Sequence, residues 1–261
     1  MRITFFLLFL STLLAGQRDV GAYSVHEIKS ELLGQSRPFY VHLPAGYDTL
    51  STPPAVLYVL DAESRFPLTY AIADYQRFSA GLPPVVVVGI PNRSAEERGT
   101  FFLPGPGSQS DTFLRHLREE LVPAVDSLYR VSSRRYLMGH SHGAVFTLYA
   151  LLRDPEVFVG YLASDPSVKT LLPLADTLLR TTYPDIRLYH TSTDVAYGYL
   201  EEVRDDIHAD QFAFRQLLAS RAPGGLSIAY EHIPDDHGNG YVPAINFGLR
   251  YLFFGWQRPA D

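Results

Sequence analysis

The chain has 261 residues, of which 46% are hydrophobic and 19% charged, and its formal net charge is −6 at pH 7. This composition is typical of a globular protein and excludes a largely disordered one. The negative charge argues against a nucleic-acid-binding protein, since such proteins are usually basic. The chain has no cysteine, which excludes disulfides, cysteine-ligated zinc and a cysteine nucleophile.

The first sixteen residues predict a secretory signal peptide. Arg2 precedes an apolar run from Ile3 to Leu14, and the small residues Ala15 and Gly16 follow it. The run is short for a membrane span, so a membrane anchor or a buried first helix is the weaker interpretation. We expect cleavage near Gly16–Gln17, a secreted or periplasmic protein without membrane attachment after cleavage, and a single domain over residues 17–261.

Beyond this segment, short apolar runs alternate with helical patterns, which predicts βαβ units and a mostly parallel sheet. Continuous apolar runs such as VVVVGI suit strands that are covered on both faces. The eight predicted strands are residues 23–30, 37–44, 55–61, 85–90, 135–139, 158–164, 186–192 and 226–233. The clearest helical patterns cover residues 111–130, 143–153, 205–220 and 241–254, and the Pro- and Gly-rich residues 102–110 predict a surface loop.

Ser141 lies in the segment YLMGHSHGAVF, which has a G-x-S-x-G pattern. The pattern alone arises by chance in roughly one chain in ten, so its context decides. A predicted buried strand ends at Gly139 and a helical pattern begins near Gly143, and a strand-to-helix turn is where a serine nucleophile of this type stands. The two glycines fit a turn that leaves no room for side chains. We therefore predict that Ser141 is a nucleophile.

A serine nucleophile needs a histidine base and an acid that orients it, and after this turn the acid and the histidine follow in chain order. His237 follows the last predicted strand, in the loop PDDHGNGY, and is the predicted base. Asp194 is the first acid after the seventh strand and is the preferred orienting acid. Glu201 and Glu202 are its rivals.

Two backbone N–H groups are candidates for an oxyanion hole, which stabilises the negative charge of the reacting carbonyl oxygen. The first belongs to His142, directly after the serine. The second belongs to Ala62, after the third predicted strand, with Asp61 as the alternative. We expect the Asp61 side chain to fix this loop rather than to take part in the chemistry.

Several segments between about Arg37 and Phe254 together resemble one family. They are RPFYVHLPAGYD, PAVLYVLDAES, VVVVGIPN, the stretch from REELVPAVDSLYR through the serine turn to DPEVF, SDPSV, and DDHGNGYVPAINFGLRYLF. The chain resembles the putative-esterase family of α/β hydrolases, which includes esterase D, enterobactin-type siderophore esterases and feruloyl esterases. It departs from the family pattern after the serine, where His142 and Ala144 replace the usual residues, and at Ala62, where glycine is usual.

The resemblance implies an α/β-hydrolase fold with an eight-stranded, mostly parallel sheet and helices on both faces. It implies a serine esterase in which Ser141 is the nucleophile, His237 the base and Asp194 or a nearby Glu the acid, with no cofactor. No His or Asp residues stand at metal-ligand spacing, so we predict no metal site.

The expected partner is a small-molecule or oligomeric ester. Siderophore, hydroxycinnamoyl, acetylated polysaccharide and simple acyl esters all stay open, as does the oligomeric state. The rival functions are an acyltransferase of the same fold and a binding protein that keeps the fold without the chemistry.

Overall fold

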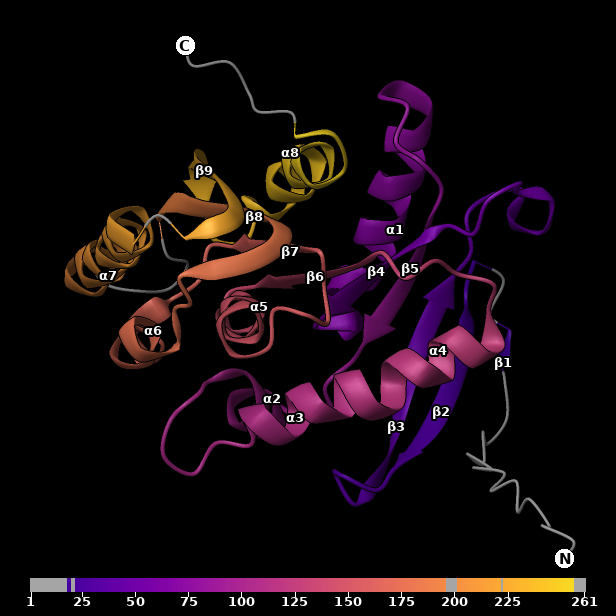
Figure 1. The fold of residues 1–261 in the computed structure, drawn as a ribbon, viewed down its shortest axis with the longest axis horizontal. Helices are drawn as coiled ribbons and strands as arrows, with labels where there is room; N and C mark the ends of the chain where they lie inside the picture. The colour runs from indigo at the N-terminus through magenta and orange to yellow at the C-terminus, as the bar shows by residue number, and fades with distance from the viewer. Residues whose placement is uncertain (1–17, 20–21, 196–200, 222, 256–261) are drawn as a thin grey trace, which may run out of the picture.

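The structure is a computed structural model that describes residues 18–19, 22–195, 201–221 and 223–255 (Figure 1). The predicted signal peptide, residues 1–16, lies outside the described residues. Within the described ranges, no helix has both the length and the hydrophobicity that crossing a bilayer requires.

A single sheet of nine strands forms the centre of the molecule, in the order β1-β2-β3-β5-β4-β6-β7-β8-β9. The strands are β1 (Arg18–Asp19), β2 (Ser24–Ser30), β3 (Gln35–His42), β4 (Ala55–Leu60), β5 (Val85–Ile90), β6 (Arg135–His140), β7 (Gly160–Ser164), β8 (Thr182–Val195) and β9 (Gly224–Asp236). The pairs β1/β2, β2/β3 and β3/β5 are antiparallel, and the remaining neighbours are parallel. All eight predicted strands are present as β2 to β9, which confirms the mostly parallel α/β sheet.

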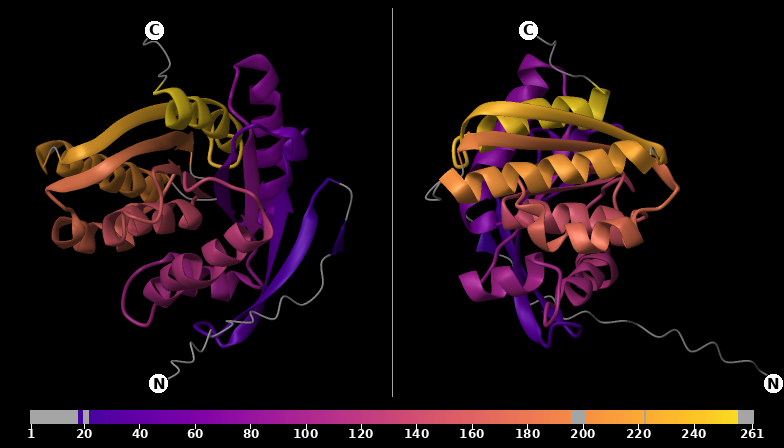
Figure 2. Two further views of the ribbon diagram at one scale, coloured as in Figure 1. Left: turned by 45° about the vertical axis from the view of Figure 1, so that its right-hand side comes forward. Right: turned by 90° about the vertical axis from the view of Figure 1, so that its left-hand side faces the viewer.

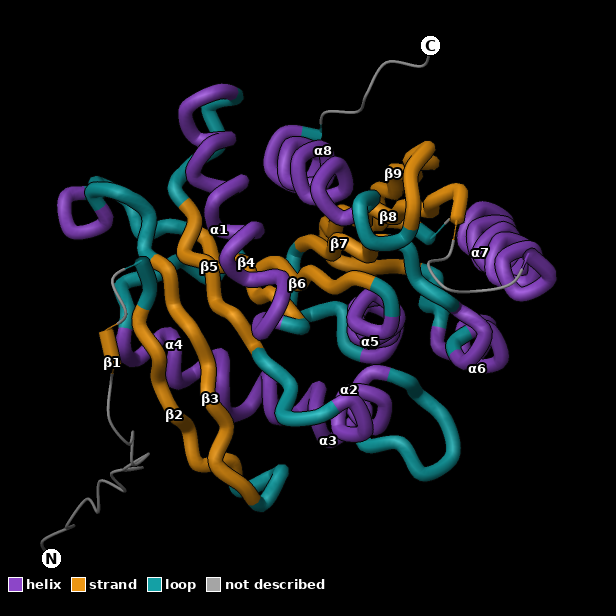
Figure 3. Tube along the Cα trace, turned by 180° about the vertical axis from the view of Figure 1, so that it is seen from behind, coloured by secondary structure: helices purple, strands orange, loops and turns teal. Residues whose placement is uncertain are grey.

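Helices cover both faces of this sheet (Figures 1 and 3). One face carries α1 (Ala62–Ser79) and α8 (Tyr241–Phe254). The other face carries α2 (Ala95–Phe102), α3 (Ser110–His116), α4 (Val122–Leu128), α5 (His142–Arg153), α6 (Leu172–Leu178) and α7 (Glu201–Arg221). A π-helical turn, Leu117–Leu121, joins α3 to α4, and α7 runs alongside β8 and β9 (Figure 2).

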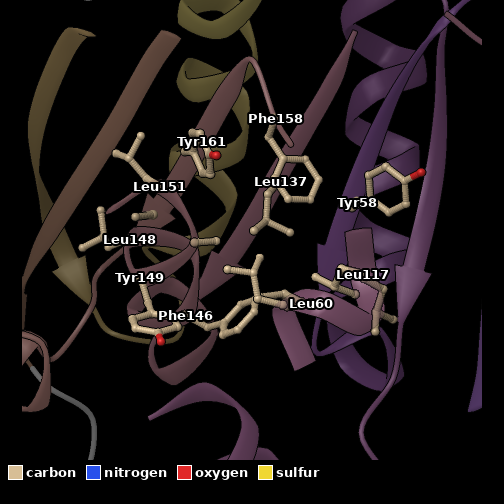
Figure 4. Close-up of a cluster of buried hydrophobic side chains, with 14 of the residues drawn as sticks. Tyr58, Leu60, Leu117, Leu137, Phe146, Leu148, Tyr149, Leu151, Phe158 and Tyr161 are labelled. Carbon is tan, nitrogen blue, oxygen red and sulfur yellow. The ribbon is translucent and has the colours of Figure 1, made fainter. Parts of the chain in front are cut away.

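The apolar strands create a core on each side of the sheet. All residues of β4 are buried, and their side chains alternate between the two faces, as strand geometry requires. Tyr58 and Leu60 pack in the same core as Phe146 of α5 (Figure 4). Val59 packs in the opposite core with Phe66 of α1. This two-sided burial explains why the central strands are apolar throughout rather than alternating.

The parallel strands bring their carboxyl ends to one edge of the sheet, where open α/β sheets bind ligands. Ala62 follows β4, Ser141 follows β6, Asp165 follows β7 and His237 follows β9. Four segments that are distant in sequence therefore meet at this edge, and the candidate site is built there.

Candidate active site

Ser141 occupies a strained turn between β6 and α5. Its φ is 57° and its ψ is −122°, a conformation that non-glycine residues adopt only when the surrounding structure imposes it. Its N–H donates to the Ser164 carbonyl at 2.9 Å, and its own carbonyl accepts from the Val145 N–H at 3.1 Å. These two bonds fix the turn between the neighbouring strand and the new helix.

The two glycines of the pattern are required by packing. A Cβ at Gly139 would lie 2.2 Å from the carbonyl carbon and oxygen of Gly143 and 2.7 Å from Oγ1 of Thr147. A Cβ at Gly143 would lie 3.0 Å from Oδ2 of Asp61. The sequence pattern therefore reflects close contact between β6, α5 and the end of β4.

Ser141 and His237 line the same cavity, which has a volume of about 60 Å³. The loops after β6, β7 and β9, together with β8 and α7, enclose it. Its other lining residues are His142, Asp165, Ser167, Thr193, Ile207 and His208. The structure thus brings together the serine and the histidine that the sequence analysis singled out.

The His237 ring is held by a buried carboxylate. Its Nδ1 lies 2.7 Å from Oδ2 of Asp165. The same carboxylate accepts hydrogen bonds from the backbone N–H of Thr193 at 3.2 Å, from its hydroxyl at 2.5 Å and from Nε2 of Gln211 at 3.1 Å. Burial alone would raise the pKa of Asp165, but the hydrogen bonds and the His237 charge outweigh it and lower the pKa to about 2. Asp165 is therefore ionised at neutral pH.

Asp194 does not hold His237, so the predicted pairing is wrong. Oδ1 of Asp194 lies 2.7 Å from Nε2 of His232, whose Nδ1 lies 2.9 Å from Oγ of Ser192. Successive strand residues point to opposite faces, and Thr191 and Thr193 are residues of β8 that contact Asp165. Asp194, the next residue, is consequently directed to the other face. The side chains of the rivals, residues 201 and 202, lie outside those that the structure describes.

Asp165 is the site residue that the sequence analysis missed. It follows the sixth predicted strand, one strand earlier than the acid was expected. A signal for it was present, since SDPSV places a carboxylate directly after the carboxyl end of a buried strand. Its φ of 48° lies in the left-handed region, which aspartate and asparagine tolerate better than most residues.

The predicted oxyanion donors lie at the starts of two helices that follow adjacent strands of the sheet. Ala62 is the first residue of α1 and His142 is the first residue of α5, so neither N–H has a partner within its helix. Strands β4 and β6, which precede these helices, pair directly, with Val59 opposite Met138. The two N–H groups therefore belong to the same edge of the site.

Asp61 and Arg98 form an ion pair beside these donors. The Asp61 carboxylate accepts from Nε of Arg98 at 2.6 Å and from its Nη2 at 2.8 Å, and also from Nδ2 of Asn92 at 2.7 Å. The Asp61 side chain is 6% exposed and that of Arg98 23%. As expected, Asp61 fixes its loop. Arg98, a residue of α2, is thus a structural partner of Asp61.

Among the residues that the structure describes, no three or more His, Asp or Glu side chains are grouped as metal ligands would be.

Residues 30–209 match the family described as putative esterase, over more than half of the chain. The chain belongs to the putative esterase family. Among curated relatives of this esterase-family protein, it is 31% identical over 157 residues to the ferri-bacillibactin esterase BesA of Bacillus subtilis, covering 51% of the chain and 52% of the relative. It is 28% identical over 177 residues to the siderophore enterobactin esterase of Emericella nidulans, covering 55% and 56%. The chain thus spans about half the length of these relatives.

Solved structures share the fold of this family member. It superposes on an IroE-like serine hydrolase from Shewanella oneidensis with a TM-score of 0.75 at 23% identity, covering 88% of this chain and 80% of that one. For the siderophore hydrolase EstB from Aspergillus nidulans the TM-score is 0.74 at 19% identity, with 93% and 99% covered. These likenesses establish the α/β-hydrolase fold.

Proposed function

We propose that this esterase-family protein hydrolyses carboxylic esters through an acyl-enzyme on Ser141. The observation that carries the proposal is one shared cavity: a serine on a strained strand-to-helix turn lines it together with a histidine whose ring is bonded to a buried carboxylate. This arrangement has the parts of a serine hydrolase triad in the chain order serine, acid, histidine.

In the proposed mechanism each group has one role. Because Nδ1 of His237 is bonded to Asp165, its Nε2 is the nitrogen left to take the proton of Ser141 as Oγ attacks the ester carbonyl. The imidazolium then gives this proton to the departing alkoxide, which leaves as the alcohol. Water repeats the sequence on the acyl-enzyme, releases the acid and restores the serine.

Asp165 and the two helix-start N–H groups support these steps electrostatically. The ionised Asp165 keeps the proton of His237 on Nδ1 and stabilises the imidazolium that forms. The N–H groups of Ala62 and His142 bind the oxyanion of the tetrahedral intermediate, where one such donor contributes about 10²- to 10³-fold in rate.

For the substrate we propose an ester of a siderophore or of a related small molecule. The support is the names of the curated relatives, which include siderophore esterases from bacteria and fungi. The polar lining of the cavity, with three histidines and two serine or threonine hydroxyls besides Ser141, suits an oxygen- or nitrogen-rich ester better than a long fatty acyl chain. The signal-peptide pattern supports a secreted or periplasmic location, with residues 17–261 as one domain.

Active-site labelling and a substrate panel test this function. A fluorophosphonate probe should label the wild type and not the Ser141→Ala variant. The panel compares chromogenic short-chain esters, a ferric catecholate trilactone and feruloylated sugars, each with and without an added alcohol as acyl acceptor. Hydrolysis by the wild type alone is the expected result. Product formation only with the alcohol would identify an acyltransferase, and absence of both labelling and turnover would favour a binding protein.

A further inference from the structure

His140, the last residue of β6, is a buried histidine that the proposed mechanism does not use. It is 1% exposed. Its Nδ1 lies 3.1 Å from Oγ of Ser164, and its Nε2 is buried without a hydrogen-bond partner among the described residues. Burying an imidazole with one unsatisfied nitrogen costs folding free energy, so we looked for a role of His140 that offsets this cost.

The ring of His140 packs directly against the ring of His237. Their centroids are 4.4 Å apart, and their planes are inclined by 35°. On another side of His140, the ring of Tyr241 meets it edge-on, with centroids 5.4 Å apart. The Arg65 guanidinium in turn lies 4.5 Å from the centroid of Tyr241. The Arg65 guanidinium of α1 and the rings of Tyr241 and His140 therefore form a column that ends at His237.

The two sets of contacts on His237 constrain different motions. The bond from Nδ1 to Asp165 holds one edge of the ring but permits rotation about the line of that bond. A flat ring packed against the face of the His237 ring prevents this rotation, so that Nε2 of His237 stays pointed in one direction. Ser164 connects the two ends of the arrangement, since its hydroxyl contacts His140 and its carbonyl accepts from the Ser141 N–H.

We propose that His140 is a positioning residue that holds the face of the His237 ring while Asp165 holds its edge. The inference rests on the proposed role of His237 as the base. A neutral ring suits this position, because it can contact the imidazolium through its π face without repelling it. Burial and the neighbouring His237 both lower the pKa of His140 far below its ordinary value, which keeps the ring neutral.

Other ionisable groups near the two rings come from several elements. Asp165 follows β7, and His142 of α5 and His208 of α7 line the same cavity as His237. Arg65 of α1 and Arg98 of α2 act on His140 by charge. The two arginines oppose positive charge on His140, and Asp165 favours it. Removing the His140 ring would leave these charges in place while uncovering the face of the His237 ring.

Two variants test the flat ring of His140 and its polar contact with Ser164 separately. His140→Phe keeps a flat ring and removes the contact with Ser164. His140→Gln keeps a polar group and removes the ring. We expect His140→Phe to retain kcat within about threefold and to keep the acid limb of the kcat/KM pH profile. We expect His140→Gln to lose about 10- to 100-fold in kcat with little change in KM, since misplacing a reacting group has effects of this size. Its acid limb should move up by roughly half to one pH unit, because water at the exposed face stabilises the imidazolium.

Nuclear magnetic resonance titration of His237 supplies a readout that does not depend on turnover. The inference predicts that its pKa is higher in His140→Gln than in wild type and His140→Phe. An unchanged titration in His140→Gln, or equal loss of kcat in both variants, would overturn the positioning role. Failure of the wild type to label at Ser141 or to cleave any ester would instead overturn the proposed function, while the titration still decides the packing role. Thermal unfolding of each variant shows whether a loss of kcat reflects a loss of fold.

Discussion

At the scale of single residues, Asp165, which follows β7, and Asp194, near the end of β8, differ in what they contact. Asp165 bonds His237, and Asp194 bonds His232. We expect Asp165→Asn to lower kcat by about 10²- to 10⁴-fold, because the wrong imidazole tautomer is favoured and the imidazolium loses its counter-charge. We expect the matched variant Asp194→Asn to stay within about twofold of wild type, since surface changes have small effects. Steady-state kinetics on one chromogenic ester compares the two; the reverse ranking would assign the acid to Asp194.

The lowered pKa of Asp165 has a consequence for folding stability. The folded-state pKa of about 2 lies below the ordinary value of 3.8, so the unfolded chain binds this proton first as the pH falls. The ionised Asp165 makes its full contribution to the free energy of unfolding at pH values above its pKa in the unfolded chain. This contribution is lost as the pH falls between about pH 5 and pH 2. The stability of wild type relative to Asp165→Asn should therefore fall by an amount on the order of 2 kcal/mol between pH 6 and pH 2. Denaturant unfolding at several pH values measures this difference, and a constant difference would contradict the assignment.

Ser141 and His237, which the sequence predicted as nucleophile and base, line one cavity in the structure, whereas Asp165, the carboxylate bonded to His237, was not predicted. The serine was recognisable because its glycines are required by local packing and so leave a short pattern. The acid has no such pattern. Whether Asp165 or Asp194 reaches His237 depends on which face of β8 is turned to the loop after β9, and the pairing of distant strands determines that.

At the scale of elements, the close approach of β6 and α5 controls the serine turn. Gly139→Ala would place a Cβ 2.2 Å from the Gly143 backbone, and no side-chain rotation can relieve a clash with backbone atoms. We expect a loss of at least about 3 kcal/mol in the free energy of unfolding, at or beyond the usual range for overpacking. The control is Gly99→Ala in α2, where a Cβ meets nothing within 4 Å and helix propensity predicts a gain of up to about 1 kcal/mol. Equal effects of the two changes in chemical unfolding would contradict the packing argument.

The elements themselves were predictable where burial is strong. The apolar strands and helices α5, α7 and α8 follow from hydrophobic periodicity, because each packs against the sheet along one stripe or on both faces. Helix α1 was hidden by Pro67 inside it, since proline removes a helical hydrogen bond. The predicted helix over residues 111–130 is interrupted by the π turn at Leu117–Leu121, and an extra residue in one turn leaves no clear mark in the apolar pattern.

At the scale of the whole molecule, α2 connects the antiparallel part of the sheet to the side of the site where we propose the oxyanion hole. Two consecutive residues of this helix pair with different parts of the protein. Glu97 accepts from the buried Arg37 of β3 at 2.5 Å, and Arg98 neutralises Asp61. Strand β3, the helix and the loop that carries the Ala62 N–H are thus joined through charges. A change in α2 should therefore affect both stability and catalysis.

Arg98→Gln tests this connection. It leaves the buried Asp61 carboxylate without its cation, next to the N–H groups that would bind the oxyanion. We expect kcat to fall by about 10- to 100-fold, since a negative charge there opposes the transition state, and stability to fall by about 3 kcal/mol or more, as for other broken buried pairs. The double variant Arg98→Gln/Asp61→Asn removes the charge as well and should recover most of both losses. Kinetics and denaturant unfolding of Arg98→Gln, Asp61→Asn and the double variant give the coupling energy between the two residues. Additive losses would mean that the pair acts only through its shape. The proposed electrostatic link between the antiparallel part of the sheet and the site would then be wrong.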